Sequence, residues 1–539
     1  MTRFVGVAVV LAVAVADVIH AQGRGGQNWN TISADAQRTG WLRTETRISA
    51  DALQSPAAGG FQLLWKVKPE NQPRQLNTLT QPLILGNLIS HKGFKSLAFF
   101  GGSGDVVYAY DYDLGKVYWS QKLSTAAASQ PATLTCPGGL TSITRSTPLM
   151  QSAAPAGPGA LGRGGAGAPP GPPAGRGPAP PTGVNPANLP ITGAVWAISS
   201  GGMVHALNPH IGADLRTPVR IVPAGAKVIS SVLVDNVLYA ATSDACGGAQ
   251  NGVYALDVSG EGTAAKARTW ESGGATIAGS AAPTLGLNDT LYVATGSGGG
   301  RFANAVVAID SKTMQALDWF TLDTPFVTSP VAFRDAGRDF VAAAAKDGRL
   351  YVLDGRTPGG ADHRTPLARS ALYSSGGADT GGAVTTWQDR DGVRWLLVAS
   401  AGAVAADAKF AGANGAITNG FVAAFKFSGE NGSFRLEPAW TSRDLTTPAP
   451  PIVLNDVVFA LSSGAFRGGD SQMTGAQRME RSAPAVLYAL DAKTGRELWS
   501  SGRTIAASVQ NVGPSGQDGQ VYVVAADGTL YAFGIPLEH

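Results

Sequence analysis

Residues 486–499 read VLYALDAKTGRELW, and this stretch decides the fold. Its first five residues are a short apolar run of strand formers. Asp491 then begins a turn that Gly495 completes, because the carboxylate accepts backbone N–H groups and glycine tolerates a left-handed backbone. The return strand ends in Trp499, whose large apolar ring is suited to packing against a neighbouring unit. The stretch therefore predicts a strand, a tight turn and a second strand.

The same strand core recurs along the chain, usually as an aromatic residue, Ala, an aliphatic residue and Asp. The copies end at Asp111, Asn208, Asp257, Asp310, Asp354, Lys426, Asp491 and Gly534. A lone copy is only a hairpin, but eight copies in one chain indicate a repeat architecture. The four shortest separations, about 43 to 53 residues, fit a four-stranded propeller blade of about 40 to 50 residues.

The two ends of the repeat array complement each other. Residues 61–67 (FQLLWKV) form a Trp strand with no repeat before it, and the last repeat, ending at Gly534, has no Trp strand after it. Pairing them closes the ring and leaves no open sheet edge. We therefore predict an all-β fold over residues 61–539. It is an eight-bladed β-propeller of four-stranded antiparallel blades, closed by the N-terminal strand pairing with the last blade. A seven-bladed ring is the alternative, because the copy ending at Lys426 departs furthest from the motif.

The longest separation between copies contains an insertion. Residues 153–182 are almost wholly Ala, Gly, Pro and Arg. Such a segment has little apolar surface to bury, so we predict a disordered loop within the second blade.

The composition and the N-terminal residues limit the cellular location and the binding partners that we expect. Of 539 residues, 70 are Gly and 33 are Pro, which is unfavourable for a helical protein, and the net charge is only +3. That balance predicts no nucleic-acid partner. Residues 1–21 are predicted to be an export signal, with Arg3 before an apolar run and cleavage after Ala16 or Ala21. We expect an N-terminal extension over 22–60, no membrane span, and a monomer that is periplasmic or secreted.

Two cysteines are present, Cys136 and Cys246, each in a loop-like context. An oxidising compartment permits a disulfide between them, and two free thiols are the alternative. No Cys-x-x-Cys-His motif occurs, which excludes a covalently attached c-type haem, and no Cys/His cluster has zinc spacing.

The repeat, with its Asp-x-x-Thr-Gly turn and trailing Trp, resembles that of the pyrroloquinoline quinone (PQQ) propeller superfamily. Three further stretches resemble its quinoprotein alcohol dehydrogenases: residues 35–40 (DAQRTG), 291–297 (LYVATGS) and 345–354 (AKDGRLYVLD). The superfamily also includes a non-enzymatic outer-membrane barrel-assembly lipoprotein. The resemblance implies an eight-bladed ring. In the dehydrogenases PQQ lies on the ring axis and is held, together with calcium, by side chains from several blades.

The chain departs from the dehydrogenase pattern at the positions that carry the chemistry. The calcium-binding position falls on Ser297, and a lone hydroxyl is a poor substitute for the hard oxygen ligands that calcium takes. The His and Trp that flank the family's catalytic Asp are missing, so Asp323 is the nearest carboxylate. Lys346 matches the residue that contacts the quinone. Surface turn positions are the alternative for both. The adjacent cysteine pair common in these enzymes is also missing.

These departures favour a non-catalytic binding or scaffold module. Its ligand, an unidentified protein, glycan or small molecule, is expected on one face of the ring, where the loops gather. The alternative is a divergent PQQ-dependent dehydrogenase with calcium, acting on an alcohol or a sugar. In that alternative Lys346 polarises the quinone oxygens and Asp323 acts as general base.

Overall fold

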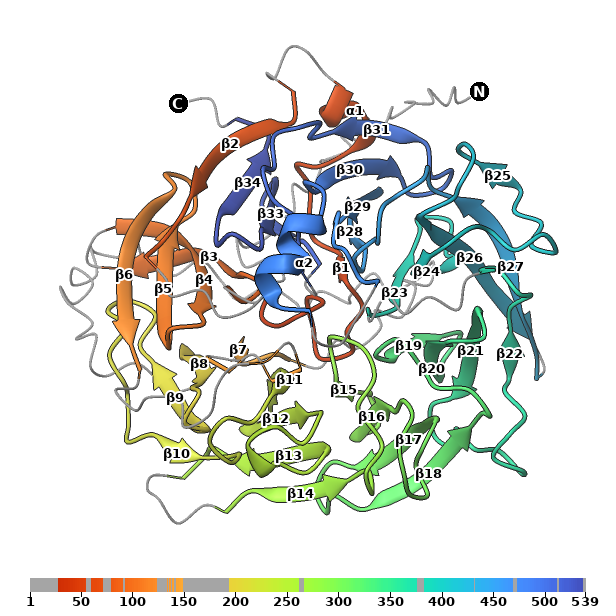
Figure 1. Ribbon diagram of the computed structural model, residues 1–539, viewed down its shortest axis with the longest axis horizontal. Helices are drawn as coiled ribbons and strands as arrows, with labels where there is room; N and C mark the ends of the chain where they lie inside the picture. Colours follow the sequence, from red (N-terminus) through yellow and green to blue (C-terminus); the bar gives the residue numbers. More distant parts are fainter. Residues whose placement is uncertain are drawn as a thin grey trace, which may run out of the picture.

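The computed structural model is a ring of sheets around a central axis (Figure 1). It describes residues 28–54, 60–70, 79–90, 93–123, 133, 135–136, 138–139, 142–148, 193–260, 266–375, 382–430, 432–468, 473–510 and 513–536. These residues form eight sheets, each built on four antiparallel strands, so the predicted eight-bladed propeller is confirmed and the seven-bladed alternative is wrong. The proposed export signal and the 153–182 insertion lie outside the described residues.

The first four blades follow one another along the chain, and in each of them the strands run in chain order from the axis outward. Blade I contains β3 (Leu83–Ser90), β4 (Gly93–Gly102), β5 (Val106–Asp111) and β6 (Lys116–Lys122). Blade II contains β7 (Ser142–Arg145), β8 (Val195–Ile198), β9 (Met203–Leu207) and β10 (Val219–Arg220). Blade III contains β11 (Val228–Val234), β12 (Val237–Thr242), β13 (Gly252–Asp257) and β14 (Arg268–Glu271), with the short 3₁₀ turn Cys246–Gly248 between β12 and β13. Blade IV contains β15 (Thr284–Leu285), β16 (Thr290–Ala294), β17 (Ala305–Asp310) and β18 (Ala316–Thr321).

The last four blades complete the ring. Blade V contains β19 (Val331–Asp335), β20 (Arg338–Ala345), β21 (Arg349–Asp354) and β22 (Ala368–Arg369). Blade VI contains β23 (Thr385–Gln388), β24 (Arg394–Ala401), β26 (Gly420–Glu430) and β27 (Ser433–Thr441), with β25 (Gly412–Ala413) added parallel to β27. Blade VII contains β28 (Ile452–Leu454), β29 (Val457–Ser462), β30 (Val486–Asp491) and β31 (Glu497–Ser500), with β1 (Trp41–Leu42) parallel to β28. Blade VIII contains β32 (Ser515–Gln517), β33 (Gln520–Val524), β34 (Leu530–Gly534) and β2 (Gln62–Val67). Two short helices, α1 (Ala50–Gln54) and α2 (Gly475–Arg481), lie outside the blades.

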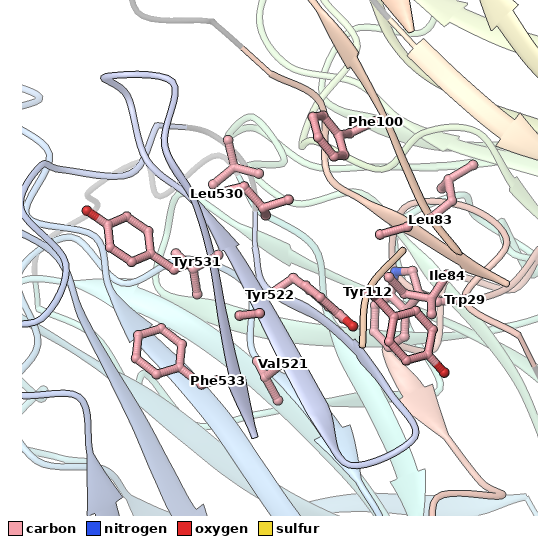
Figure 2. Close-up of a cluster of buried hydrophobic side chains, with 14 of the residues drawn as sticks. Trp29, Leu83, Ile84, Phe100, Tyr112, Val521, Tyr522, Leu530, Tyr531 and Phe533 are labelled. Carbon is pink, nitrogen blue, oxygen red and sulfur yellow. The ribbon is translucent and has the colours of Figure 1, made fainter. Parts of the chain in front are cut away.

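The N-terminal strand closes the last blade, as predicted. In the antiparallel pairing of β2 with β34, Trp65 lies opposite Ala532 and Lys66 lies opposite Tyr531. Figure 2 shows the core where blade VIII meets blade I, with Tyr522 of β33 directed toward Tyr112. Their ring centroids are 6.3 Å apart, and the Tyr112 hydroxyl donates to Asp518 Oδ2 at 2.6 Å. The closure is therefore both a strand pairing and a packed side-chain junction.

The trailing tryptophan of the repeat packs on the next blade, and the turn glycine makes room for it. Trp440 of blade VI donates from Nε1 to Ala492 O at 3.0 Å, and its ring lies against Gly495 of blade VII. A Cβ added at Gly495, whose φ is +70°, would come within 2.3 Å of that ring. The same arrangement joins Trp65 to Gly115 and Trp119 to Gly212.

The repeat's turn aspartates act as the sequence predicts. Asp491 Oδ1 accepts from the backbone N–H groups of Lys493 and Thr494 at 3.1 and 2.9 Å. Asp310 Oδ1 accepts from Thr313 N at 2.6 Å, and this bond is the main reason that the Asp310 pKa is lowered. Each carboxylate thus accepts from backbone N–H groups that have no backbone acceptor within the tight turn.

Candidate functional site

The two faces of the ring carry different connections. The innermost strands β15, β19, β28 and β32 begin on one face, the mouth face, after residues 279–283, 328–330, 448–451 and 513–514. The turn face is the opposite one, where two-residue turns such as Asp235-Asn236 and Asp518-Gly519 link innermost and second strands. Their positive φ angles, 46°, 62°, 52° and 81°, suit tight hairpin turns. A ligand on the ring axis would be reached from the mouth face.

The three positions singled out by the dehydrogenase resemblance all lie on the mouth face, between blades IV and V. Ser297 follows β16, Asp323 follows β18 and Lys346 follows β20, and these strands end on that face. Backbone contacts join the three segments, because Lys346 N donates to Pro325 O at 2.8 Å and Phe326 N donates to Thr295 O at 3.3 Å.

Their side chains lie at the surface. Ser297 and Lys346 are exposed, and the Asp323 side chain is 91% exposed. The Asp323 carboxylate pairs with Arg364 across 2.7 Å, so it faces a surface arginine. The structure therefore brings these positions to one corner of the mouth face, with their side chains exposed.

The axis itself is filled by residues 28–42, which we call the axial segment. Its contacts reach all eight blades. Backbone N–H groups of the innermost strands donate to it in six blades: Ile84 to Trp29, Arg145 to Asn30, Leu285 to Ala36, Ala332 to Gln37, Thr386 to Thr39 and Val453 to Gly40, at 2.8 to 3.0 Å. The remaining two blades are joined by Thr31 Oγ1 donating to Ser231 O and by Trp29 N donating to Gln517 Oε1. Expected from the sequence to be part of an N-terminal extension, the segment lies inside the ring.

Arg38 lies in the axial segment and is fully buried. Nε donates to Pro283 O at 2.9 Å. The other donors reach Thr31 Oγ1, Ile32 O, Ser230 Oγ and Ser231 O at 2.7 to 3.3 Å. Since a guanidinium has five N–H groups, none remains for a ligand. Burial lowers the pKa of Arg38 to about 9, against the raising effect of nearby Asp35. Arg38 is therefore still charged at neutral pH.

Asp35 is also buried on the axis, and its hydrogen bonds stay within the segment. Its carboxylate accepts from Thr39 N at 3.0 Å and from Thr39 Oγ1 at 2.5 Å. Burial raises the pKa of Asp35, and these bonds only partly oppose the rise. Arg38 thus fixes the segment against the blades, whereas Asp35 fixes the conformation of the segment itself.

Small residues and prolines close the mouth above the axial segment. Ser329 N and Ser280 N both donate to Gly382 O, at 2.9 and 3.3 Å, which joins blades IV, V and VI. Gly279 has φ +80°, and a Cβ there would come within 1.9 Å of Ser329 N. Gln81 Nε2 donates to Gly513 O and Pro514 O at 2.8 Å, which joins blades I and VIII. Neighbouring blades therefore meet at the mouth through backbone bonds between blades IV, V and VI and through the Gln81 side chain between blades I and VIII.

A hollow beside the axial segment, lined by described residues, does not fit PQQ with calcium. It offers about 10 Å³ to the centre of a water-sized molecule, room for about one water. Its lining contains no carboxylate, no base and no aromatic ring: Ile32, Ser33, Gln81, Ser280, Pro450, Pro451, Ile452, Gly513 and Pro514. Calcium takes several hard oxygens, usually including carboxylates. Within the described part of the chain, no three His, Cys, Asp or Glu side chains gather as a metal site.

Cys136 and Cys246 form a disulfide, with their Cα atoms 5.6 Å apart. Cys136 lies in the connection between blades I and II, and Cys246 lies between β12 and β13 of blade III. The bridge therefore ties an inter-blade connection to the mouth face of a later blade.

Sequence reasoning missed the role of the axial segment, although one signal for it was present. Residues 35–40 resemble a dehydrogenase entry segment, and this stretch contains Asp35, Arg38, Thr39 and Gly40. Gly40 has φ +64°, and a Cβ there would come within 2.9 Å of Thr385 Oγ1. The glycine of this motif therefore allows the backbone of the axial segment to lie close to blade VI.

Comparisons with known proteins agree with this fold. Residues 439–535, less than a fifth of the chain, match the family model described as outer membrane protein assembly factor BamB. No match is found among the curated proteins. Among the described residues, none of the helices has the length and apolar character needed to cross a membrane.

Solved structures share the propeller at low sequence identity. Quinohemoprotein alcohol dehydrogenase from Comamonas testosteroni is 14% identical with a TM-score of 0.52, over 95% of this chain and 81% of its own. A europium-containing methanol dehydrogenase is 12% identical with a TM-score of 0.53, over 94% and 98%. BamB from Moraxella catarrhalis is 12% identical with a TM-score of 0.46, over 89% and 99%. The resemblance to the PQQ-like propeller superfamily is thus confirmed at the level of the fold.

Proposed function

We propose that the protein is an exported, non-catalytic PQQ-like propeller that binds a partner protein through its mouth face. The observation that carries the proposal is the closed axis. The axial segment bonds to every blade, and a hollow beside it, lined by described residues, has room for about one water molecule. A propeller that filled its centre with its own chain keeps its loops as the available binding surface.

The mouth face has the loops for this role. The link between β24 and β26 spans residues 402–419, and the link between β29 and β30 spans 463–485 and contains α2. Figure 1 shows α2 in front of the ring, close to its centre. A capping box between Thr474 and Gln477 fixes the start of this helix. On the turn face, by contrast, the links between innermost and second strands have two to five residues in seven blades. The exception is blade II, where this link is residues 146–194 and mostly lies outside the described residues.

The match of residues 439–535 supports a scaffold role, because the matching model is described as an assembly factor. The partner under this proposal is a protein of the periplasm or the outer membrane. Export rests on the predicted signal at residues 1–21, and placement in the periplasm or outside the cell follows from it.

Calorimetric titration of the signal-free protein with PQQ, with and without calcium, tests the non-catalytic assignment. We expect no binding at high micromolar PQQ and no dye reduction with alcohols or sugars. Tight one-to-one binding that requires calcium would contradict the proposal.

The alternative is a divergent PQQ-dependent dehydrogenase, and one observation favours it. Ser297 and Lys346 lie at the same corner of the mouth face, as the resemblance requires. This function would need the axial closure to open. Lys346→Ala should then lower PQQ affinity by at least about tenfold, whereas our proposal predicts no PQQ affinity to lose.

A further inference from the structure

A groove lies on the outer rim between blades II and III. It has a volume of about 400 Å³ and is lined by Val219, Arg220, Ile221, Val222, Pro223, Lys266 and Ala267. Figure 1 shows the two strands that flank it, β10 and β14, at the outside of the ring. Each is the outermost strand of its blade, so one edge of each has no strand partner among the described residues.

The floor of this rim groove is apolar and continuous with the core. Ile221 and Val222 are buried members of a hydrophobic cluster shared by blades II and III, and Val219 and Ala267 pack against the same cluster. The floor is therefore rigid, which reduces the entropy lost when a ligand is bound.

Two basic side chains rise from opposite walls of the groove. Arg220 and Lys266 are both exposed, and neither forms an ion pair within the described part of the chain. Arg220 is nevertheless held in place, because NH1 donates to Gly201 O at 2.8 Å. The lining thus has two positive charges and no negative one.

A second rim groove, between blades VI and VII, provides an internal comparison. Its volume is about 370 Å³, and its lining includes Arg443, Asp444, Arg496 and Glu497. In this groove charged side chains form contacts with other residues of the protein. Arg443 pairs with Glu497 across 2.6 Å, and Asp444 accepts from Asn419 N at 2.7 Å. A groove of similar size therefore lacks the unbalanced positive charge of the first.

We propose that the groove between blades II and III binds an extended acidic segment of a partner protein. Carboxylate side chains of that segment pair with Arg220 and Lys266, and its aliphatic side chains cover Val219 and Ile221. The edge of β10, which lines the groove and has no further strand partner among the described residues, offers backbone groups to an extended peptide, which a fatty acid would not use. The groove reaches the mouth face at residues 221–223, which follow β10, but its lining contains no residue of the axial segment. The proposal therefore stands or falls independently of the cofactor titration.

The probe is a fluorescein-labelled peptide of ten alternating glutamate and valine residues, measured by fluorescence polarisation. We expect saturable binding to the full chain that weakens with salt. The double variant Arg220→Gln/Lys266→Gln should lower the affinity at least about tenfold, and Arg443→Gln/Arg496→Gln in the comparison groove should change it less than about twofold. Lys266→Gln alone, at an exposed position, gives a smaller loss that does not depend on the fold of the double variant.

Three results would overturn the proposal. The first is no binding of the acidic peptide to the unaltered chain, and the second is an equal loss of affinity in both double variants. The third is binding of decanoate at this groove without binding of the peptide, which would assign it to a small amphiphile.

Discussion

The rim and the axis of the ring are held together by different means. At three junctions on the rim, a tryptophan of one outermost strand lies on the turn glycine of the next blade, as with Trp440 and Gly495. At the axis a single continuous segment, residues 28–42, bonds to the innermost strands of all eight blades. The rim thus repeats the same contact between a tryptophan and a turn glycine, whereas the axis is held by one continuous segment.

This difference separates what sets the fold from what sets the function. The contact between tryptophan and turn glycine recurs along the chain, so it specifies the architecture and leaves the function open. The axial segment occurs once, and its contacts determine whether the centre of the ring is open to a cofactor.

The largest effect is expected at the axis. Arg38→Ala leaves Pro283 O without its buried donor and removes one of the two donors to Ser231 O, and we expect the free energy of unfolding to fall by about 3–5 kcal/mol. Urea unfolding measures this loss. Arg47→Ala is the matched control, because Arg47 is exposed and has a long contact of 3.3 Å with Asp518 O. Equal losses of unfolding free energy in the two variants would show that Arg38 does not stabilise the axis.

Removal of the disulfide should have the next largest effect. The Cys136–Cys246 bridge spans 110 residues, so its loss releases a long loop in the unfolded chain. We expect Cys136→Ser/Cys246→Ser to lower the free energy of unfolding by about 2–4 kcal/mol. Reduction of the unaltered protein should lower its Tm to that of the double variant. An unchanged Tm on reduction would contradict a bridge in solution.

A change at the rim should cost less than a change at the axis. Trp440→Phe keeps an aromatic plate over Gly495 but loses the hydrogen bond to Ala492 O, and we expect a loss of about 1–2 kcal/mol. Trp499→Phe is the control, since no indole hydrogen bond of Trp499 is found in the described residues. If Trp440→Phe destabilised the protein as much as Arg38→Ala, the contrast between rim and axis would fail.

The smallest effect concerns a repeat turn and appears only in acid. The Thr313 backbone N–H is the main cause of the lowered Asp310 pKa, so the ionised carboxylate stabilises the folded state. This contribution is present above the ordinary aspartate value of about 4 and is lost as the pH falls through the folded-state pKa. The unfolding free energies of Asp310→Asn and the unaltered protein should therefore converge between about pH 5 and pH 2. A constant difference over that range would count against the turn assignment.

The rim could be predicted from the sequence because its signals are local and repeated. Asp491, Gly495 and Trp499 lie within nine residues and specify a strand, a turn and a packing ring. Ring closure followed from the unmatched Trp strand at residues 61–67, which pairs with β34.

The axis could not be predicted in the same way, because its contacts join residues far apart in the chain. Arg38 bonds to Pro283 and Ser231, and neither pairing leaves a trace in local sequence. Lys346, Ser297 and Asp323 were found through resemblance, and the structure places all three at one corner of the mouth face. The resemblance gives no information on whether side chains converge at this corner, because their convergence depends on the contacts of the axial segment.

Hydrogen exchange on the axial segment, with and without excess PQQ and calcium, measures whether the axis is closed. A closed axis predicts slow exchange across residues 29–40, close to that of the innermost strands, and no change on addition of the cofactor. Fast exchange in this segment, or loss of its protection when PQQ and calcium are added, would show that the axis opens.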